Sequence, residues 1–351
     1  MHKSNTLPLN IYQALPKVDL HRHLEGSLRL TTMLDIAASH GVTIPPGVMS
    51  LSDLVQVQEH DPLTFYNFLE KFKTLRLFYR SPDVIDRITR EAVEDAARDS
   101  IRYLELRFTP VALSRAEGFP LHDVMDWVTR AAQDAAQQYQ ILVNLIASVN
   151  RHESPEMARE VAWLALEYSG RGLVGLDLAG NEAEFPAAPF TEIFREARQN
   201  GLHLTVHAGE WAGAQNVREA LELLGAERIG HGVRVLEDPQ VTALAAERGT
   251  AFEVCVTSNY QSGVINELHR HPLPAMLEQG LNVTIHTDDP SVSRINLSHE
   301  YQLVCEDLGL SLDTLKKCIL AAGQAAFLAE PERQILVARL KKELELFKNA
   351  D

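Results

Sequence analysis

The sequence predicts an α/β protein whose strands close into a (β/α)8 TIM barrel. Short apolar runs rich in β-branched residues recur along the 351 residues, and many of them end in a polar residue. Longer segments of helical period separate these runs, and eight alternating units of strand and helix indicate a closed parallel barrel. An open doubly wound sheet is the competing arrangement. The expected strands are residues 18–23, 101–108, 141–150, 173–178, 202–207, 228–231, 250–255 and 281–287.

The segments between the expected strands carry the boundary signals of helices. Several begin with proline in the first turn, where its missing N–H costs no hydrogen bond. Gly201, Gly249 and Gly280 each stand just before an expected strand, where a helix commonly ends in a left-handed residue. The clearest helical periods cover residues 83–98, 121–139, 155–168, 189–200 and 239–248.

Residues 24–99 are too many for a single crossover and predict a helical insertion after the first strand. Helical patterns cover residues 31–40 and 62–78, and the second pattern is rich in phenylalanine. Its apolar side chains either pack on the rim of the barrel or form a lid over its mouth. A further amphipathic helix at residues 330–348 most simply covers the exterior. No linker interrupts the chain, so we expect residues 1–351 to form one domain.

The composition limits the kinds of partner. The net charge is −15, from 33 Lys+Arg and 48 Asp+Glu, which argues against a phosphate backbone or an anionic membrane as a partner. Three scattered cysteines fit a reducing compartment, and no apolar run approaches the roughly 18 residues of a membrane helix. We therefore expect a cytoplasmic protein. The exterior helices carry no decisive apolar patch, so the sequence predicts no oligomeric state.

Four residues at the ends of expected strands predict a metal site. His21 and His23 are two apart in a strand, so both side chains point the same way. His207 and Asp288 end two later strands, and the carboxyl ends of barrel strands meet at one mouth. Three imidazoles and one carboxylate suit Zn²⁺ with a position left for water, and Fe²⁺ or Co²⁺ fits the same ligands. No lysine lies near residues 175–180, so a single ion is expected.

Acid and base candidates lie beside these ligands. Glu210 follows His207 by three residues, and burial near apolar groups can raise its pKa enough to make it an acid at neutral pH. His231 stands between two glycines and can approach a metal-bound water. Asp288 and Asp289 would repel each other unless a cation or a proton separated them. The chain has 14 histidines, and we expect ordinary surface or core positions for His40, His60, His122, His203, His269, His271 and His299.

The same residues stand in motifs that together resemble the adenosine deaminase family. The motifs occur in order and cover almost the whole chain, so the resemblance is specific. Weaker matches lie at residues 102–107 and 150–152. The motifs are His21-Arg-His-Leu-Glu-Gly26, Asp177-Leu-Ala-Gly-Asn-Glu182, His207-Ala-Gly-Glu210, Gly230-His-Gly232, Cys255-Val-Thr-Ser-Asn259 and Thr287-Asp-Asp-Pro290.

The resemblance implies a zinc-dependent barrel enzyme that hydrolyses the 6-amino group of a purine nucleoside to a carbonyl and releases ammonia. Glu210 would donate a proton to N1, which makes C6 electrophilic toward zinc-bound hydroxide. His231 would serve as base or electrostatic partner, and Asp288 would also orient the water. The metal would be held by His21, His23, His207 and Asp288.

The resemblance also places the substrate. Asp289 would hydrogen-bond N7, and the backbone N–H of Gly180 would reach N3. Glu25 stands where the nucleoside enzymes more often carry an aspartate associated with the ribose hydroxyls, whereas relatives acting on free adenine often carry glutamate there. His286 replaces a more usual asparagine. We expect adenosine or deoxyadenosine as substrate, with adenine or a modified 6-aminopurine nucleoside of the aminodeoxyfutalosine type as alternatives.

Other classes of function stay open at this point. One is a barrel amidohydrolase acting on a different ring or amide, and another is a purine-binding or signalling barrel without turnover. The zinc deaminases that act on bases in nucleic acids use H-x-E with P-C-x-x-C. No C-x-x-C occurs in this chain, so the sequence excludes that design. The expected partner is a small-molecule purine nucleoside, with no nucleic acid and no membrane.

Overall fold

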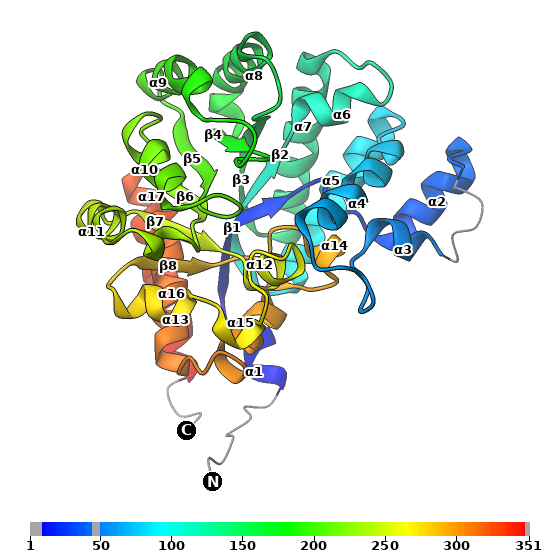
Figure 1. Cartoon of the computed structure of the whole chain (residues 1–351). Helices are drawn as coiled ribbons and strands as arrows, with labels where there is room; N and C mark the ends of the chain where they lie inside the picture. Colours follow the sequence, from blue (N-terminus) through cyan, green and yellow to red (C-terminus); the bar gives the residue numbers. More distant parts are fainter. Residues whose placement is uncertain (1–8, 44–49, 348–351) are drawn as a thin grey trace.

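A ring of parallel strands forms the centre of the molecule (Figure 1). The computed structural model describes residues 9–43 and 50–347. The eight strands follow one another in the order β1 to β8, and every neighbouring pair is parallel. A bridge between Arg22 and Asp288 joins β1 to the end of β8. Around it, the N–H of His23 donates to the carbonyl of Asp288 and the N–H of Asp288 donates to the carbonyl of His21, both at 2.8 Å. The expected barrel is confirmed.

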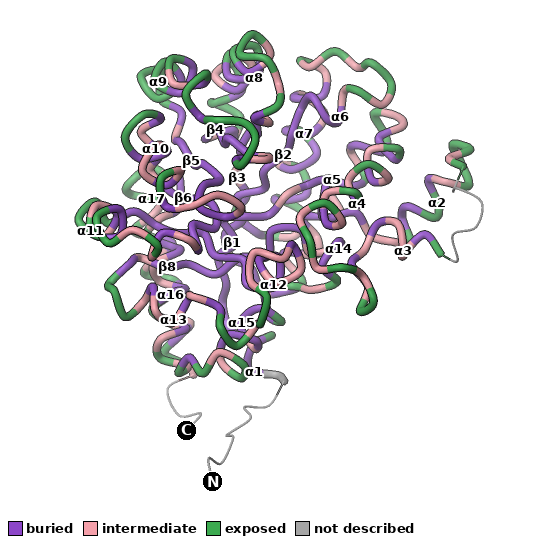
Figure 2. The backbone as a smooth tube through the Cα atoms, viewed as in Figure 1, coloured by how far each residue is buried: buried purple, intermediate pink, exposed green. Residues whose placement is uncertain are grey.

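Each strand lies within two residues of its predicted bounds. Parallel strands that are buried on both faces have continuous apolar sequences, and this pattern is why the sequence predicted their positions. Six of the seven residues of β1 are buried, for example, and Figure 2 shows burial concentrated along the strands. The strands are β1 (Lys17–His23), β2 (Ile101–Phe108), β3 (Leu142–Asn150), β4 (Leu173–Ala179), β5 (His203–Ala208), β6 (Arg228–His231), β7 (Ala251–Val254) and β8 (Asn282–Ile285).

Helices surround the strands and connect their ends (Figure 1). Short 3-10 helices occur at Arg76–Phe78 (η1), Ser169–Arg171 (η2), Ala188–Phe190 (η3), Val235–Glu237 (η4), Leu268–Arg270 (η5) and Glu345–Phe347 (η6). The α-helices are α1 (Leu9–Ala14), α2 (Leu30–His40), α3 (Leu51–Val55), α4 (Phe65–Leu75), α5 (Pro82–Arg98), α6 (Pro110–Arg115), α7 (Leu121–Tyr139), α8 (Pro155–Glu167), α9 (Thr191–Gln199), α10 (Ala214–Glu222), α11 (Pro239–Arg248), α12 (Val256–Gln261), α13 (Leu273–Glu278), α14 (Pro290–Ser293), α15 (Leu297–Glu306), α16 (Leu312–Ala325) and α17 (Glu330–Leu344). None of the helices in this described part of the chain is long and apolar enough to cross a membrane.

The expected helix at residues 330–348 is α17 followed by η6, and residue 348 lies outside the described residues. Its buried leucines include Leu336 and Leu340. Helix α17 packs against α16, where a Cβ added to Gly323 would lie 2.7 Å from Leu340 Cδ1. A glycine in α16 therefore allows the close approach of the C-terminal helix to the outside of the barrel.

The insertion after β1 consists of α2, α3, α4 and η1, ahead of the crossover helix α5. Figure 1 shows α2 and α3 beside the barrel and α4 closer to the strands. The ring of Phe65 in α4 lies 4.1 Å, centroid to centroid, from the ring of Trp211 in the segment after β5. Phe68 is buried, and it lines the cavity at the carboxyl ends of the strands. The predicted phenylalanine-rich pattern thus lies at the mouth of the barrel.

Candidate metal centre and active site

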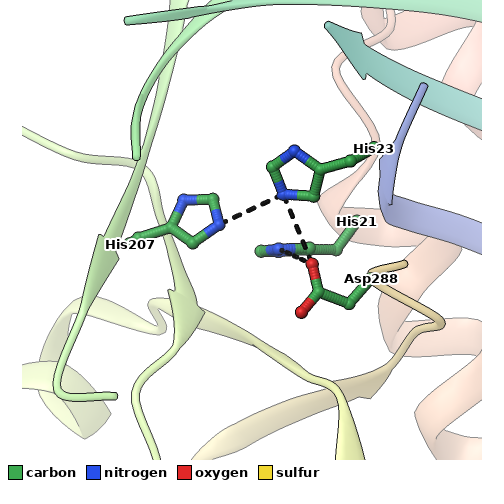
Figure 3. Close-up of side chains that lie close together, drawn as sticks. All are labelled: His21, His23, His207 and Asp288. Carbon is green, nitrogen blue, oxygen red and sulfur yellow. Dashed lines mark hydrogen bonds and ion pairs between the residues drawn. The ribbon is translucent and has the colours of Figure 1, made fainter. Parts of the chain in front are cut away.

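Four side chains from three strand ends converge on one point (Figure 3). His21 and His23 end β1, His207 lies in β5, and Asp288 follows β8. His23 Nε2 lies 3.3 Å from His207 Nε2 and 3.3 Å from Asp288 Oδ1. His21 Nε2 lies 3.4 Å from the same oxygen, Asp288 Oδ1. All four ligand atoms lie within 4.8 Å of one another.

The partners of the imidazoles show that this donor set fits a cation. His21 Nδ1 lies 2.8 Å from Glu253 Oε2, and His207 Nδ1 lies 2.9 Å from Asp177 Oδ1. Each carboxylate takes the Nδ1–H, which leaves the Nε2 lone pair facing the shared centre. His21 Nε2 is buried and has no hydrogen-bond partner among the described residues. Ligand separations near 3.3 Å are roughly the edge of a tetrahedron with metal–nitrogen bonds of about 2.0–2.1 Å.

Two residues at the mouth of the barrel hold left-handed backbone conformations without being glycine. His231 has a φ of 59° and Asp288 has a φ of 63°. Such conformations cost on the order of 1–3 kcal/mol and cluster at functional sites. Ser258 Oγ donates a hydrogen bond of 2.7 Å to Asp288 Oδ2, so the second oxygen of this carboxylate is also held. These backbone conformations lower the stability of the fold, and they direct both side chains toward the centre.

Glu210 and His231 face each other beside the centre. Glu210 Oε2 lies 3.6 Å from His231 Nε2, which lies 3.8 Å from Asp288 Oδ2. Burial raises the pKa of Glu210 well above its usual value, and the neighbouring carboxylates of Asp288 and Glu182 raise it further. Burial lowers the pKa of His231 well below its usual value despite the charge of Asp288. Burial therefore favours the protonated form of the Glu210 carboxyl and the neutral form of the His231 imidazole.

A polar chain fixes the ring of His231 from behind. Asn259 Nδ2 lies 3.1 Å from His231 Nδ1, and Asn259 Oδ1 lies 3.3 Å from His271 Nε2. His271 is buried, and burial lowers its pKa to about 3, so it stays neutral. Because the Asn259 amide donates to Nδ1, the proton of His231 is on Nε2, the atom that faces Glu210 and Asp288.

Glu182 holds the loop that carries Glu210. Its carboxylate accepts four consecutive backbone N–H groups, those of Gly209 (2.9 Å), Glu210 (2.6 Å), Trp211 (2.8 Å) and Ala212 (3.0 Å). The side chain is 4% exposed. An anion bound by several backbone donors is a strong, directional anchor. The position of Glu210 is therefore set by a residue on the segment after β4.

A cavity of about 270 Å³ opens beside the metal ligands. Gly180, Asp289 and Glu25 all line it. Asp289 Oδ1 and Glu25 Oε2 are buried and have no hydrogen-bond partner among the described residues. Glu25 Oε1 accepts a hydrogen bond of 2.6 Å from the N–H of Thr109. These two buried oxygens are available to a ligand, because burying polar atoms without a partner is costly.

The structure brings all the site residues named from the sequence to this centre and cavity, whereas His286 lies elsewhere. His286 Nδ1 accepts a hydrogen bond of 3.0 Å from the N–H of Leu20, and His286 Nε2 lies 2.7 Å from Thr284 Oγ1. This histidine is fully buried and does not line the cavity. Its departure from the more usual asparagine therefore has a structural role, joining β8 to β1.

Sequence reasoning assigned no role to the residues that orient the site, although two of them, Asp177 and Glu182, stand in one of the motifs. Glu253 and Asp177 hold the ligand imidazoles, while Glu182 holds the catalytic loop. A signal was present, because Glu253 and Asp177 are charged residues inside otherwise apolar strands. A charge in a buried strand needs a partner, although the sequence does not tell which one.

A (β/α)8 barrel with three imidazoles and a carboxylate at its strand ends defines a metal-dependent hydrolase of the amidohydrolase type. The family model described as adenosine deaminase matches residues 16–343. The chain is 36% identical over 333 residues to adenosine deaminase of Klebsiella pneumoniae (strain 342), covering 95% of this chain and 99% of the relative. It is 38% identical over 328 residues to adenosine deaminase of Erwinia tasmaniensis, covering 93% and 98%. The chain belongs to the adenosine deaminase family.

Solved structures agree with this assignment. An amidohydrolase from Burkholderia ambifaria with bound Zn has a TM-score of 0.88 at 27% identity, covering 99% of this chain and 94% of that chain. Adenine deaminase from Arthrobacter aurescens has a TM-score of 0.86 at 25% identity, covering 94% and 99%. The N6-mAMP deaminase of Arabidopsis has a TM-score of 0.83 at 29% identity, covering 95% and 99%. The similarity thus extends over the whole barrel.

Proposed function

We propose that this chain catalyses the hydrolytic deamination of adenosine and deoxyadenosine to inosine and deoxyinosine. The oxygen of water becomes the carbonyl oxygen at C6, and the 6-amino group leaves as ammonia. One observation carries the proposal: a buried carboxyl, Glu210, and a buried imidazole, His231, face each other beside a donor set for a divalent cation in one cavity. A proton donor, a group that can stabilise the charge on the attacking oxygen and a cation site are what hydrolysis of an aromatic amidine requires.

The resident cofactor in this proposal is one zinc ion, held by His21, His23, His207 and Asp288. Three imidazoles and a carboxylate are typical zinc ligands, and Fe²⁺ or Co²⁺ accepts the same donors. The similar amidohydrolase of Burkholderia ambifaria contains zinc. When bound, such an ion lowers the pKa of a coordinated water toward about 7 and so makes a nucleophile available at neutral pH.

Glu210 supplies the proton that activates the purine. Because burial keeps its carboxyl protonated, Glu210 donates a hydrogen bond and then a proton to N1. Protonation at N1 draws electrons from C6 and makes that carbon a better electrophile. His231 stabilises the charge that develops on the attacking oxygen, since its Nε2–H lies between Glu210 and Asp288.

Asp289 and Gly180 orient the base. The Asp289 carboxyl, whose raised pKa favours the protonated form, donates a hydrogen bond from its free Oδ1 to N7. Burial raises that pKa first, and the charge of Asp288 raises it further. The backbone N–H of Gly180 reaches N3 from the opposite wall. Its φ of 95° requires glycine, which lets the main chain approach the ring plane.

Residues 1–351 act as a single domain in this proposal, and the insertion at residues 24–99 serves as a lid. Phe68 and Phe72 of α4 line the same cavity as the metal ligands. The contact between Phe65 and Trp211 joins the insertion to the loop that carries Glu210. Closing this segment over a bound purine would exclude water from the reaction.

The test is a side-by-side assay of zinc-loaded protein on adenosine, deoxyadenosine and adenine, read by ultraviolet spectra and by released ammonia. We expect both nucleosides to be converted, and Glu210→Gln to serve as the inactive control. Three unchanged substrates would sink the proposal. Tight purine binding without ammonia would favour a binding barrel, while conversion of adenine alone would favour the free base, the substrate named for the similar Arthrobacter aurescens enzyme.

A further inference from the structure

Arg76 is an exception among the arginines of the described residues. It is shielded from solvent in part, yet its guanidinium makes no hydrogen bond with those residues and lies within ion-pair distance of none of their carboxylates. Within the same residues, Arg130 and Arg294 also lack such partners, but both are exposed and therefore solvated. A partly buried guanidinium loses water without gaining a partner, which is costly. An arginine in this state calls for a partner from outside the chain.

The position of Arg76 points to that partner. Arg76 begins η1, directly after α4, and it lines the substrate cavity together with Lys73 and His152. Glu25 lines the same cavity as Arg76, so the two side chains border the same space. Lys73 is exposed and lies 2.5 Å from Glu70, so its charge is already matched. The unmatched positive charge in the cavity wall is therefore that of Arg76.

The proposed contacts to the base decide which part of a substrate meets Arg76. Glu210 takes N1, Gly180 takes N3 and Asp289 takes N7. N9 lies across the purine from C6, so its substituent points away from the metal ligands. Among the polar residues that line the cavity and take no part in these contacts are Glu25, Arg76 and His152. The free Oε2 of Glu25 can accept a sugar hydroxyl, and Arg76 then lies beside whatever extends beyond the sugar.

We infer, building on the proposed function, that the sugar carries a phosphate and that Arg76 recognises it. The substrates of this class are adenosine 5′-monophosphate and deoxyadenosine 5′-monophosphate. A guanidinium pairs with two phosphate oxygens through parallel N–H bonds, and such charge-assisted bonds are strong in a shielded site. The reaction at C6 is the same, with water consumed and ammonia released, and the phosphate ester stays intact.

The first experiment measures kcat/KM for the two 5′-monophosphates and for the two nucleosides with the same zinc-loaded preparation. We expect the monophosphates to be favoured by on the order of tenfold or more, the gain typical of a hydrogen bond to a charged group. Arg76→Met lowers kcat/KM for the monophosphates at least about tenfold more than for the nucleosides. Arg76→Gln is a second variant in case the methionine variant fails to fold.

Arg80→Met is the matched control. Arg80 lies four residues further along, pairs with Glu117 at 2.8 Å and does not line the cavity. The substitution Arg80→Met removes the same charge from the same segment as Arg76→Met. The long-range attraction of anions therefore falls equally in these two variants. We expect the ratio of monophosphate to nucleoside efficiency to stay at its original value in Arg80→Met. An equal drop in both variants would overturn the role of Arg76.

A binding measurement separates this inference from the proposed function. Calorimetry with inosine 5′-monophosphate and inosine, the two products, needs no turnover. We expect tighter binding of the monophosphate, a steep loss of that preference with added salt, and its loss in Arg76→Met. Equal affinity for both products overturns the inference even if adenosine is converted. If no purine is converted, the proposed function fails, and the binding preference alone decides whether Arg76 is a phosphate site.

Discussion

Two clusters of buried ionisable residues lie within this barrel, and only one of them contains equal numbers of acidic and basic side chains. The barrel-core cluster consists of Glu105, Arg107, Arg228 and Glu253, all at most 2% exposed. Arg228 Nε lies 2.6 Å from Glu253 Oε1, and Arg228 also donates a short hydrogen bond to Glu105. Arg107 Nη2 lies 2.8 Å from Glu253 Oε2. Two positive and two negative groups lie together, so the formal charges of this cluster balance one another.

The strand-end cluster is unbalanced. It consists of the carboxyl groups of Glu25, Glu210, Asp288 and Asp289, and among the described residues none of them has a lysine or arginine within ion-pair distance. Two buried oxygens in this cluster have no hydrogen-bond partner among the described residues, namely Glu25 Oε2 and Asp289 Oδ1. Buried carboxyl groups persist when they are protonated, paired or bound to a metal. The barrel-core cluster is therefore part of the scaffold, whereas the strand-end cluster can bind a cation and a substrate.

The two clusters meet at Glu253. One of its oxygens accepts from Arg228, and the other lies 2.8 Å from His21 Nδ1. Burial alone would raise the pKa of Glu253, but Arg107 and Arg228 hold it well below its usual value. A permanently ionised Glu253 keeps the His21 ring oriented toward the metal centre. The scaffold thus prepares the site, and substitutions in either cluster should have distinguishable effects.

The largest effect is expected from breaking the donor set. His207→Ala removes one imidazole, and we expect the metal to be lost and turnover to fall by more than the ~10–100-fold that losing a hydrogen-bond partner of a ligand costs. Metal content by mass spectrometry and ammonia release measure both. His203→Ala is the control at the other end of β5, where His203 pairs with Glu227 at 2.9 Å. A His207→Ala protein with a full complement of metal would contradict the assignment.

Glu210→Gln is expected to keep the metal and lower turnover by about 10²–10⁴-fold, because it removes the proton donor. The pKa of Glu210 is raised by burial, so the acid form is present below that pKa and is lost as pH rises through it. Wild-type activity should therefore fall on the alkaline side, and this limb should be missing from the residual activity of the variant. A pH profile with an unchanged alkaline limb would assign the acid to another group.

Arg228→Met tests the barrel-core cluster. The substitution leaves Glu105 and Glu253 buried without this partner, and breaking such a pair costs about 3–5 kcal/mol of stability. We expect a clear drop in the urea midpoint of unfolding, measured by circular dichroism. The metal-free protein should show the same drop, because the cluster contains no metal ligand. If stability fell only in the metal-loaded form, the cluster would contribute to stability only through the metal centre.

The smallest effect is expected from Asp177→Asn, at the border between scaffold and site. Asp177 Oδ1 lies 2.9 Å from His207 Nδ1. Burial would raise the pKa of Asp177, but the charge of Arg107 and the hydrogen bond from His207 hold it below its usual value. The amide orients the ring less well, so we expect metal affinity to fall about 10–100-fold. Competition with a chelator of known affinity measures it. Unchanged affinity would show that packing alone holds the ring.

The barrel was predictable because its cause is local. A strand buried on both faces is a continuous apolar run, and a helix between two such strands has its own period and caps. The stretch from β5 to α11 shows this, since Gly249 ends α11 in a left-handed conformation as predicted. The helix expected at residues 189–200 instead begins as η3, a boundary that sequence patterns place poorly.

The amino-acid sequence by itself determined the eight strands, the helical insertion and the set of side chains that meet at the strand ends, because these depend on short motifs and local patterns. Tertiary structure alone decided which carboxylate holds which imidazole. His21 and Glu253 are 232 residues apart, and Arg76 reaches the cavity only because α4 lies over the mouth of the barrel. Charged side chains pair with groups that are close in space but distant in sequence, and a local sequence pattern does not indicate which distant residues come together.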